Sequence, residues 1–354
     1  MSHCGCRLWV LLPLLFVIPL VAVEKPPADP PAPRGYVCGR SAKPPVIDGQ
    51  LDDEAWKAAA WTDDFVDIEG DAKPKPAHRT RAKMVWDDTG LYIAAEITEP
   101  HVWATLTDHD AVIFHDPDFE VFLDPDGDNH LYGELELNAK NTTWDLLLTK
   151  PYRDSGRAIT AWEITGLKTA VHVNGTLNDP SDTDAGWTVE ILWPWAGVNE
   201  LAEKVAPPKA GDRWRINFSR VEWDFEVKGG KYVKIEKRPE HNWVWSPQGA
   251  IDMHRPERWG YLQFAEKADG VKYTPDPAQA VKDRLTAAYA AQQGYHKKHG
   301  RFATSAAALG LPDSPLGAPE FEVTRHGFEA RLVAPKNAGG KTWTITQDSR
   351  LWRE

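Results

Sequence analysis

The feature that most constrains the fold of this chain is a succession of short segments, between residues 46 and 264, in which apolar and polar residues alternate between turn sequences. A period of two is typical of strands that bury one face. At residues 87–90, for example, Asp-Asp-Thr-Gly separates two such segments and is typical of a hairpin turn. Long helical patterns are almost absent, so the sequence predicts a mainly β protein, an antiparallel β-sandwich without internal repeats. The expected strands are residues 82–86, 91–96, 119–123, 132–138, 187–192, 214–220 and 259–264.

The first 23 residues have the pattern of an export signal. Arg7 precedes a run of sixteen uncharged residues, from Leu8 to Val23, which is short for a membrane span and typical of a secretory signal peptide. We therefore predict a secreted or periplasmic protein without a stable membrane span after cleavage, and an uncleaved N-terminal anchor is the alternative. Cys4 and Cys6 precede the apolar run, whereas the cysteine of a lipoprotein would follow it.

A proline-rich segment follows. Five prolines between residues 26 and 33 favour extended, solvated backbone, so residues 24–45 are predicted to be a linker and residues 46–265 the sandwich. Removal of the signal would leave Cys38, which we expect in this linker. One cysteine cannot form an internal disulfide, so the fold must depend on its core.

Composition limits the possible partners. The net charge is −11, from 41 Lys and Arg against 52 Asp and Glu. Because proteins that bind phosphate backbones carry a basic surface, no nucleic-acid partner is expected. The 17 Trp residues are numerous for 354 residues. Some will belong to the core, and the surplus fits a protein that binds ligands through flat aromatic surfaces.

The last part of the chain, residues 266–354, predicts a small α+β extension. Asp276 followed by Pro277 is typical of a helix start, apolar residues then follow helical spacing to Tyr295, and Gly300 is typical of a helix end. A short Ala-rich turn and three short strands are expected between there and Trp352.

Seven short motifs between residues 46 and 265 occur in an informative order. They are Ile-Asp-Gly at 47–49 with Trp56, Leu-Tyr-Ile at 91–93, Phe-Glu-Val-Phe-Leu-Asp-Pro at 119–125, Gly-Trp-Thr-Val-Glu-Ile at 186–191, Gly-Asp-Arg-Trp-Arg-Ile-Asn-Phe-Ser-Arg at 211–220, Trp-Ser-Pro at 245–247 and His-Arg-Pro-Glu-Arg-Trp-Gly at 254–260. In this order they resemble the family 9 carbohydrate-binding modules. The resemblance implies a DOMON-like β-sandwich, binding of a glycan ligand in association with polysaccharide catabolism, and structural calcium.

The resemblance extends to the sugar site, but several residues there differ from those of the characterised modules. It implies Glu120 as a polar contact to the sugar. Where the characterised modules have two stacking tryptophans, this chain has Phe114 and Met253, and Glu136 replaces a basic residue. Residues 113–120 and 141–152 resemble one subgroup of the family.

The chemistry of sugar binding selects further candidates. A pyranose needs an aromatic plate for its C–H face and a few planar polar groups for its hydroxyls. Each aromatic candidate has burial in the core as its alternative, and for His254 the alternative is a histidine whose ring is hydrogen-bonded by the backbone. The pair Trp243 and Trp245 shares one strand face, which either covers the core or forms a platform. We expect one concave surface formed by Phe114, Glu120, Asn138, Trp144, Arg220, Trp223, Trp245 and His254.

Asp124, Asp126 and Asp128 place carboxylates at alternate positions around a glycine turn. Ca²⁺ takes six to eight oxygen ligands, so this loop is the predicted calcium site, although it lacks the glutamate and flanking helices of an EF-hand. The alternative is a solvated acidic turn with side-chain-to-backbone hydrogen bonds.

No motif of a known catalytic class is present in residues 24–354, and no catalytic residue is assigned. Glycosidases use two carboxyl groups roughly 5 to 9.5 Å apart, and an acidic pair near Glu120 and Glu136 is the candidate for that chemistry. We therefore expect a non-catalytic glycan binder, with a glycoside hydrolase acting on O-glycosyl bonds and an envelope scaffold without a sugar ligand as the alternatives.

Overall fold

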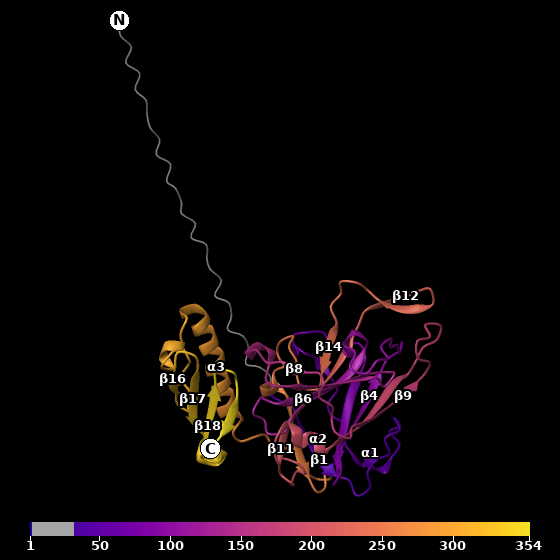
Figure 1. Ribbon diagram of the computed structural model, residues 1–354, viewed down its shortest axis with the longest axis horizontal. Coiled ribbons are helices and arrows are strands. Elements are labelled where there is room, and N and C mark those ends of the chain that lie inside the picture. Colours follow the sequence, from indigo (N-terminus) through magenta and orange to yellow (C-terminus); the bar gives the residue numbers. More distant parts are fainter. Residues whose placement is uncertain (2–31) are drawn as a thin grey trace. The chain divides into compact units, whose positions relative to one another are not determined.

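The computed structural model describes Met1 and residues 32–354 (Figure 1). Residues 2–23 of the predicted signal peptide and the proline-rich residues 24–31 lie outside the described residues. Among the described residues, no helix is both long and apolar enough to cross a membrane.

Thirteen of the described strands form one hydrogen-bonded network. They are β1 (Gly35–Arg40), β2 (Val66–Asp67), β3 (Thr80–Trp86), β4 (Gly90–Thr98), β5 (Asp118–Asp124), β6 (Tyr132–Asn138), β7 (Thr143–Leu148), β8 (Ala158–Ile159), β9 (Lys168–Asn174), β10 (Gly186–Pro194), β11 (Arg213–Glu222), β14 (His241–Val244) and β15 (Gly260–Ala265). Their order is β8-β7-β6-β5-β11-β15-β1-β3-β4-β10-β9, and β14 pairs with β11 and β2. A separate hairpin consists of β12 (Phe225–Lys228) and β13 (Lys231–Lys234).

The sheet curls so that strands from distant places in this order share one core. Phe119 and Val121 of β5 lie in the same buried cluster as Val189 and Ile191 of β10. Because side chains alternate along a strand, the residues between them face the opposite, outer side of the sheet. A second buried cluster around Phe122 covers part of that outer side. The mainly β, two-layered architecture confirms the predicted sandwich.

The structure corrects the predicted boundary between linker and sandwich. Residues 35–40, expected in the linker, form β1, which is hydrogen-bonded in parallel to both β15 and β3, whereas the other pairings of the described strands are antiparallel. Cys38 is completely buried and is a free thiol. Because Gly35 and Gly39 have no side chains, the alternation of apolar and polar residues that would mark this strand is not visible in the sequence. Both are required by close packing, since a Cβ atom would meet neighbouring atoms 2.2 and 2.9 Å away.

Two short helices, α1 (Glu54–Ala58) and α2 (Trp195–Leu201), accompany the sheet. Helix α1 buries Trp56, whose indole N–H donates to Glu190 Oε1 at 2.5 Å. The short 3₁₀ turns are η1 (Ile113–His115), η2 (Tyr152–Asp154), η3 (Pro256–Arg258), η4 (Ala307–Leu309) and η5 (Lys336–Ala338).

The C-terminal extension has its own core. Helix α3 (Gln279–His299) packs on a four-stranded antiparallel sheet, one strand more than predicted, formed by β16 (Glu320–Val323), β17 (Phe328–Val333), β18 (Thr342–Thr346) and β19 (Leu351–Arg353). Asp276 Oδ1 accepts the Ala278 N–H at 2.9 Å before the helix, and Gly300 ends it with φ of 66°. Both predicted helix ends are thus close to the observed ones.

Candidate functional site

A cleft of about 380 Å³ opens on the outer side of β5, β6 and β7. This volume lies within the range of small-ligand sites, about 300–1,000 Å³. Four of the predicted binding residues line it: Phe114, Glu120, Trp144 and His254. The other polar and aromatic lining residues are Phe122, Glu134, Glu136, Tyr152, Glu240, Asn242 and Asp252, and aliphatic residues and Met253 complete the wall.

Strand register places the central residues of the cleft. Ser219 of β11 pairs with Glu120 of β5, Glu120 with Glu136 of β6, and Glu136 with Trp144 of β7. Directly paired residues of neighbouring strands point to the same side of a sheet and lie about 4.5–5.5 Å apart at Cβ. The four side chains therefore form one row that runs from a hydroxyl through two carboxylates to a partly exposed indole.

Phe114 is held over this row by η1. Its backbone N–H donates to Glu136 Oε2 at 2.9 Å, and its carbonyl oxygen accepts the indole N–H of Trp223 at 2.9 Å. The ring is partly exposed. Glu136 thus has a structural task as well as a place in the cleft.

His254 and Tyr152 form another part of the wall, with their ring centroids 4.4 Å apart. His254 Nδ1 is hydrogen-bonded to the hydroxyl of Tyr132 at 3.0 Å, so a side chain rather than the backbone fixes the ring. Burial, and then the nearby charge of Arg153, lower the pKa of His254 to about 4. The imidazole is therefore neutral at physiological pH.

The floor of the cleft is unusually acidic. Oxygens of Asp118, Glu120 and Glu136 lie within 4.8 Å of one another, and Glu134 lies beside them on β6. Burial raises the pKa of Glu120 to about 7. Burial and mutual repulsion raise the pKa values of Asp118, Glu134 and Glu136 well above the ordinary range of carboxyl groups.

Two predicted binding residues belong to the core side of the sheet instead. Trp245 is only 1% exposed and packs against Phe218, with ring centroids 5.9 Å apart. Arg220 is equally buried and is ion-paired with Glu99 and, at 2.7 Å, with Glu222. Strand parity explains both errors. The cleft side carries Ser219 of β11 and its partner Val244 of β14, so the adjacent residues Arg220 and Trp245 face the core.

Asn138 and Trp223 were also predicted to bind the sugar, but they make structural contacts outside the cleft. Asn138 is buried; its amide donates to Asp116 Oδ2 at 3.0 Å, and its oxygen accepts the N–H groups of residues 140 and 142. It therefore builds the turn between β6 and β7. Trp223 supports Phe114 from behind and lines a separate cleft, where Lys234 Nζ lies 3.8 Å from its ring centroid.

Sequence reasoning missed Tyr152, Glu134, Glu240 and Asp252 as lining residues. Glu134 had a visible signal, because it shares a strand face with Glu136. Tyr152 ends a segment typical of the family subgroup. Nothing local in the sequence indicates Glu240 or Asp252, which reach the cleft through long-range chain packing.

The loop predicted to bind calcium brings its three carboxylates together, within 4.8 Å of one another. Both oxygens of Asp124 accept backbone N–H groups at 2.9 Å, and burial, followed by repulsion from Asp126 and Asp128, raises the pKa of Asp124. Arg350 Nε donates to Asp128 at 2.8 Å and so compensates one charge. The remaining donor set is all oxygen and fits Ca²⁺. The side-chain-to-backbone hydrogen bonds of the alternative are present as well.

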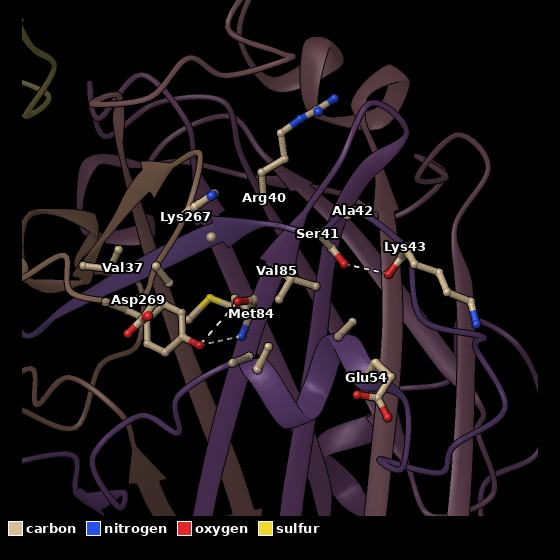
Figure 2. A pocket seen from close by; sticks show the side chains of 16 residues that line it. Val37, Arg40, Ser41, Ala42, Lys43, Glu54, Met84, Val85, Lys267 and Asp269 are labelled. Atoms are coloured by element: carbon tan, nitrogen blue, oxygen red, sulfur yellow. Dashed lines mark hydrogen bonds between the residues drawn. The ribbon is translucent and has the colours of Figure 1, made fainter.

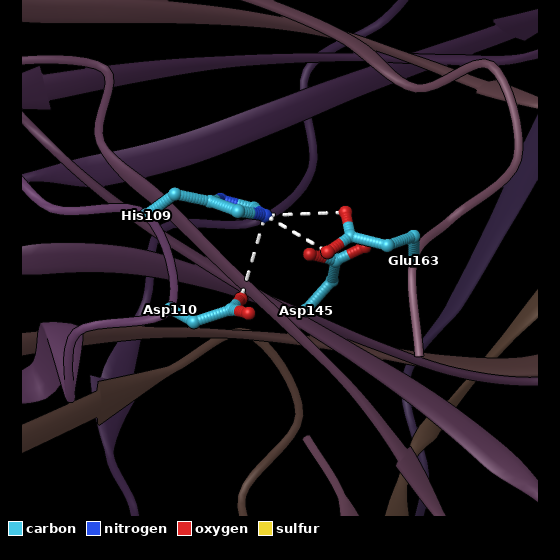
Figure 3. Close-up of side chains that lie close together, drawn as sticks. All are labelled: His109, Asp110, Asp145 and Glu163. Carbon is cyan, nitrogen blue, oxygen red and sulfur yellow. Dashed lines mark hydrogen bonds and ion pairs between the residues drawn. The ribbon is translucent and has the colours of Figure 1, made fainter. Parts of the chain in front are cut away.

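A second polar cluster lies beside the cleft. His109 Nε2 is 3.1 Å from both carboxylate oxygens of Glu163 and 3.5 Å from Asp110 Oδ1, and these groups point toward one another (Figure 3). Burial opposes the charged imidazole, but the contacts with Glu163 and Asp110 raise the pKa of His109 overall. Asp145, directly after Trp144, accepts the Ile164 N–H at 2.5 Å. The cluster thus links the loop before η1 to β7.

A different pocket, of about 360 Å³, lies beside β1 (Figure 2). Its one aromatic lining residue is Tyr36, whose hydroxyl donates to the Ala60 carbonyl at 2.6 Å and accepts the Met84 N–H at 3.1 Å. None of the predicted binding residues lines it. The cleft over β5–β7 is therefore the better candidate for a functional site.

Comparison with known proteins agrees with the fold and the motifs. The model of a family described as carbohydrate family 9 binding domain-like matches residues 47–244. Exoglucanase XynX of Acetivibrio thermocellus is 26% identical over 157 residues, which are 44% of this chain and 12% of that protein, so the chain spans a small part of this relative.

Two solved structures are also similar. A family 9 carbohydrate-binding module from Caldicellulosiruptor kristjanssonii, in complex with cellotriose, has a TM-score of 0.44 and 18% identity, with 68% of this chain and 100% of that chain covered. A putative carbohydrate-binding protein from Bacteroides uniformis has a TM-score of 0.47 and 15% identity, with 66% and 100% covered. Because the family model covers more than half of the 354 residues, this chain belongs to the carbohydrate family 9 binding domain-like proteins.

Proposed function

We propose that the chain is an exported, non-catalytic glycan-binding protein that serves polysaccharide catabolism, and that the cleft over β5–β7 is its sugar site. The observation that carries the proposal is the row of Glu120, Glu136 and Trp144 on three adjacent strands, with Phe114 above it. This is the combination of aromatic face and planar polar groups that a pyranose needs. Membership of a carbohydrate-binding family supports the same conclusion.

The proposal has two further parts, export of the chain and a structural calcium ion. The apolar run after Arg7 supports export through a cleaved signal peptide. The three converging carboxylates at 124–128 support a structural Ca²⁺. In this arrangement Asp124, Asp126 and Asp128 would hold the ion, and its charge would neutralise the repulsion among them.

A glycosidase is the second candidate, favoured by the raised pKa of Glu120 beside Glu136. The geometry favours binding instead. The two carboxyl groups come from directly paired residues on one side of one sheet. Canonical glycosidases place their two carboxyl groups on either side of the scissile bond.

A glycan array with the mature protein tests the proposal, followed by calorimetry on the best ligands. Trp144→Ala should weaken binding by about 1–3 kcal/mol. Trp352→Ala is the matched control, because that tryptophan is also partly exposed but lies on β19, outside the cleft. A protein that binds no glycan would instead be a scaffold, and release of reducing sugar that is lost in Glu120→Gln would identify an enzyme.

A further inference from the structure

The lining of the cleft carries an excess of acidic over basic residues. Among the described residues that line it are five carboxylates and no Lys or Arg. The five are Glu120, Glu134, Glu136, Glu240 and Asp252. A neutral sugar needs carboxylates only as hydrogen-bond acceptors, and one or two are enough for that.

The acidic groups of the floor also have no internal counter-ion. In the described part of the chain, no ion pair involves Asp118, Glu120, Glu134 or Glu136. Glu134 Oε2 and Asp118 Oδ2 are buried atoms without any hydrogen-bond partner. Buried carboxylates are normally paired, so the site is incomplete as a structural unit.

Two cations near the wall of the cleft, Arg153 and Lys234, make contacts with other groups. Arg153 donates to the His254 carbonyl and pairs with Glu257 at 3.0 Å, and Lys234 Nζ donates to the His115 carbonyl. Neither lines the cleft. No Lys or Arg of the described residues pairs with the floor, which is therefore suited to a ligand that brings its own positive charge.

From these observations we propose that the cleft binds a glycan that carries a free, protonated amine, such as a chain of glucosamine units. An ammonium group supplies a positive charge and three N–H donors, which match the unpartnered oxygens of the floor. Phe114 and Trp144 supply the aromatic surfaces for the pyranose ring. The inference rests on the proposed function of the same cleft and names its ligand class.

Three trisaccharides that differ only at C2 test the inference on the full mature chain. Calorimetry compares the β-1,4-linked trimers of glucosamine, N-acetylglucosamine and glucose, at a pH at which the free amine is protonated. We expect the glucosamine trimer to bind at least roughly tenfold more tightly than the other two, the factor that one charge-assisted hydrogen bond provides. Glu134→Gln should remove most of this preference, so that the three trimers bind with similar affinity.

Each other outcome is decisive. If the glucose or acetylated trimer binds as tightly as the glucosamine trimer, the amine inference is wrong and the proposed function stands. If no glycan of any kind binds, the proposed function itself fails. If binding requires Ca²⁺ and is lost with EDTA, a metal ion rather than an amine supplies the charge, and the inference is overturned. The melting temperature of Glu134→Gln is the control, and an unchanged value would show that the substitution acts on the ligand and not on the fold.

Discussion

Two buried charge clusters lie on opposite sides of the same strands and differ in one respect. On the core side of β11, Arg220 is surrounded by Glu99 and Glu222, and donates to Thr98 O at 2.9 Å. On the cleft side, no ion pair within the described part of the chain involves Glu120 or Glu136, and no Lys or Arg lines the cleft. The first cluster is complete within the chain and serves the fold. The second is incomplete, which is the property expected of a binding site.

The largest expected effect tests the complete cluster. Arg220→Ala should destabilise the protein by about 3–5 kcal/mol, because it leaves two carboxylates buried without their cation. Chemical denaturation with a far-UV signal measures the loss. A change below about 1 kcal/mol would show that the core-side cluster is not the structural unit described above.

Calcium offers a comparison with a third acidic group of residues, at 124–128. If Ca²⁺ binds there, the free energy of unfolding should rise by about 2.7 kcal/mol when free Ca²⁺ is a hundredfold above its dissociation constant. Thermal melts with added Ca²⁺ and with EDTA measure the difference, and Asp126→Asn should reduce it. Identical melts would leave this loop as a hydrogen-bonded acidic turn.

On the cleft side, removal of an aromatic plate should affect the ligand and not the fold. Trp144→Ala should cost about 1–3 kcal/mol of glycan binding, by analogy with alanine substitutions of aromatics that stack on nucleic-acid bases. Calorimetry measures the affinity, and the melting temperature serves as the control. Trp245→Ala should show the reverse pattern, since that side chain is in the core.

The smallest expected effect is the pH dependence of the incomplete cluster. The pKa of Glu120 is raised to about 7 from 4.5 in the folded protein. A raised carboxyl pKa means that the folded state binds the proton more tightly. Its stabilising contribution is complete below about pH 4.5 and is lost as the pH rises through about 7. The melting temperature should therefore fall between pH 5 and 8, and less so in Glu120→Gln.

The sequence predicted the sandwich, the extension and four residues that line the cleft, and the misses have physical causes. Alternation shows that a strand has two faces, but it does not show which face meets the core. Arg220 and Trp245 were therefore placed in the binding site although parity puts them inside. The row through Glu120, Glu136 and Trp144 depends on the register of three strands, which local sequence does not reveal. Glu120 was predictable because a family motif marks it.

The position of β1 has a consequence for how the chain folds. Gly35 pairs with Tyr261, so the strand that joins the two halves of the sheet finds this partner only after more than two hundred further residues have been made. Contacts between such distant residues slow folding, because the chain loses the entropy of closing a long loop before the contact stabilises it. The family match at 47–244 includes neither β1 nor β15. A fragment trimmed to those bounds would keep the cleft strands β5, β6 and β7 but would lose β1 and β15, the strands that join the two halves of the sheet.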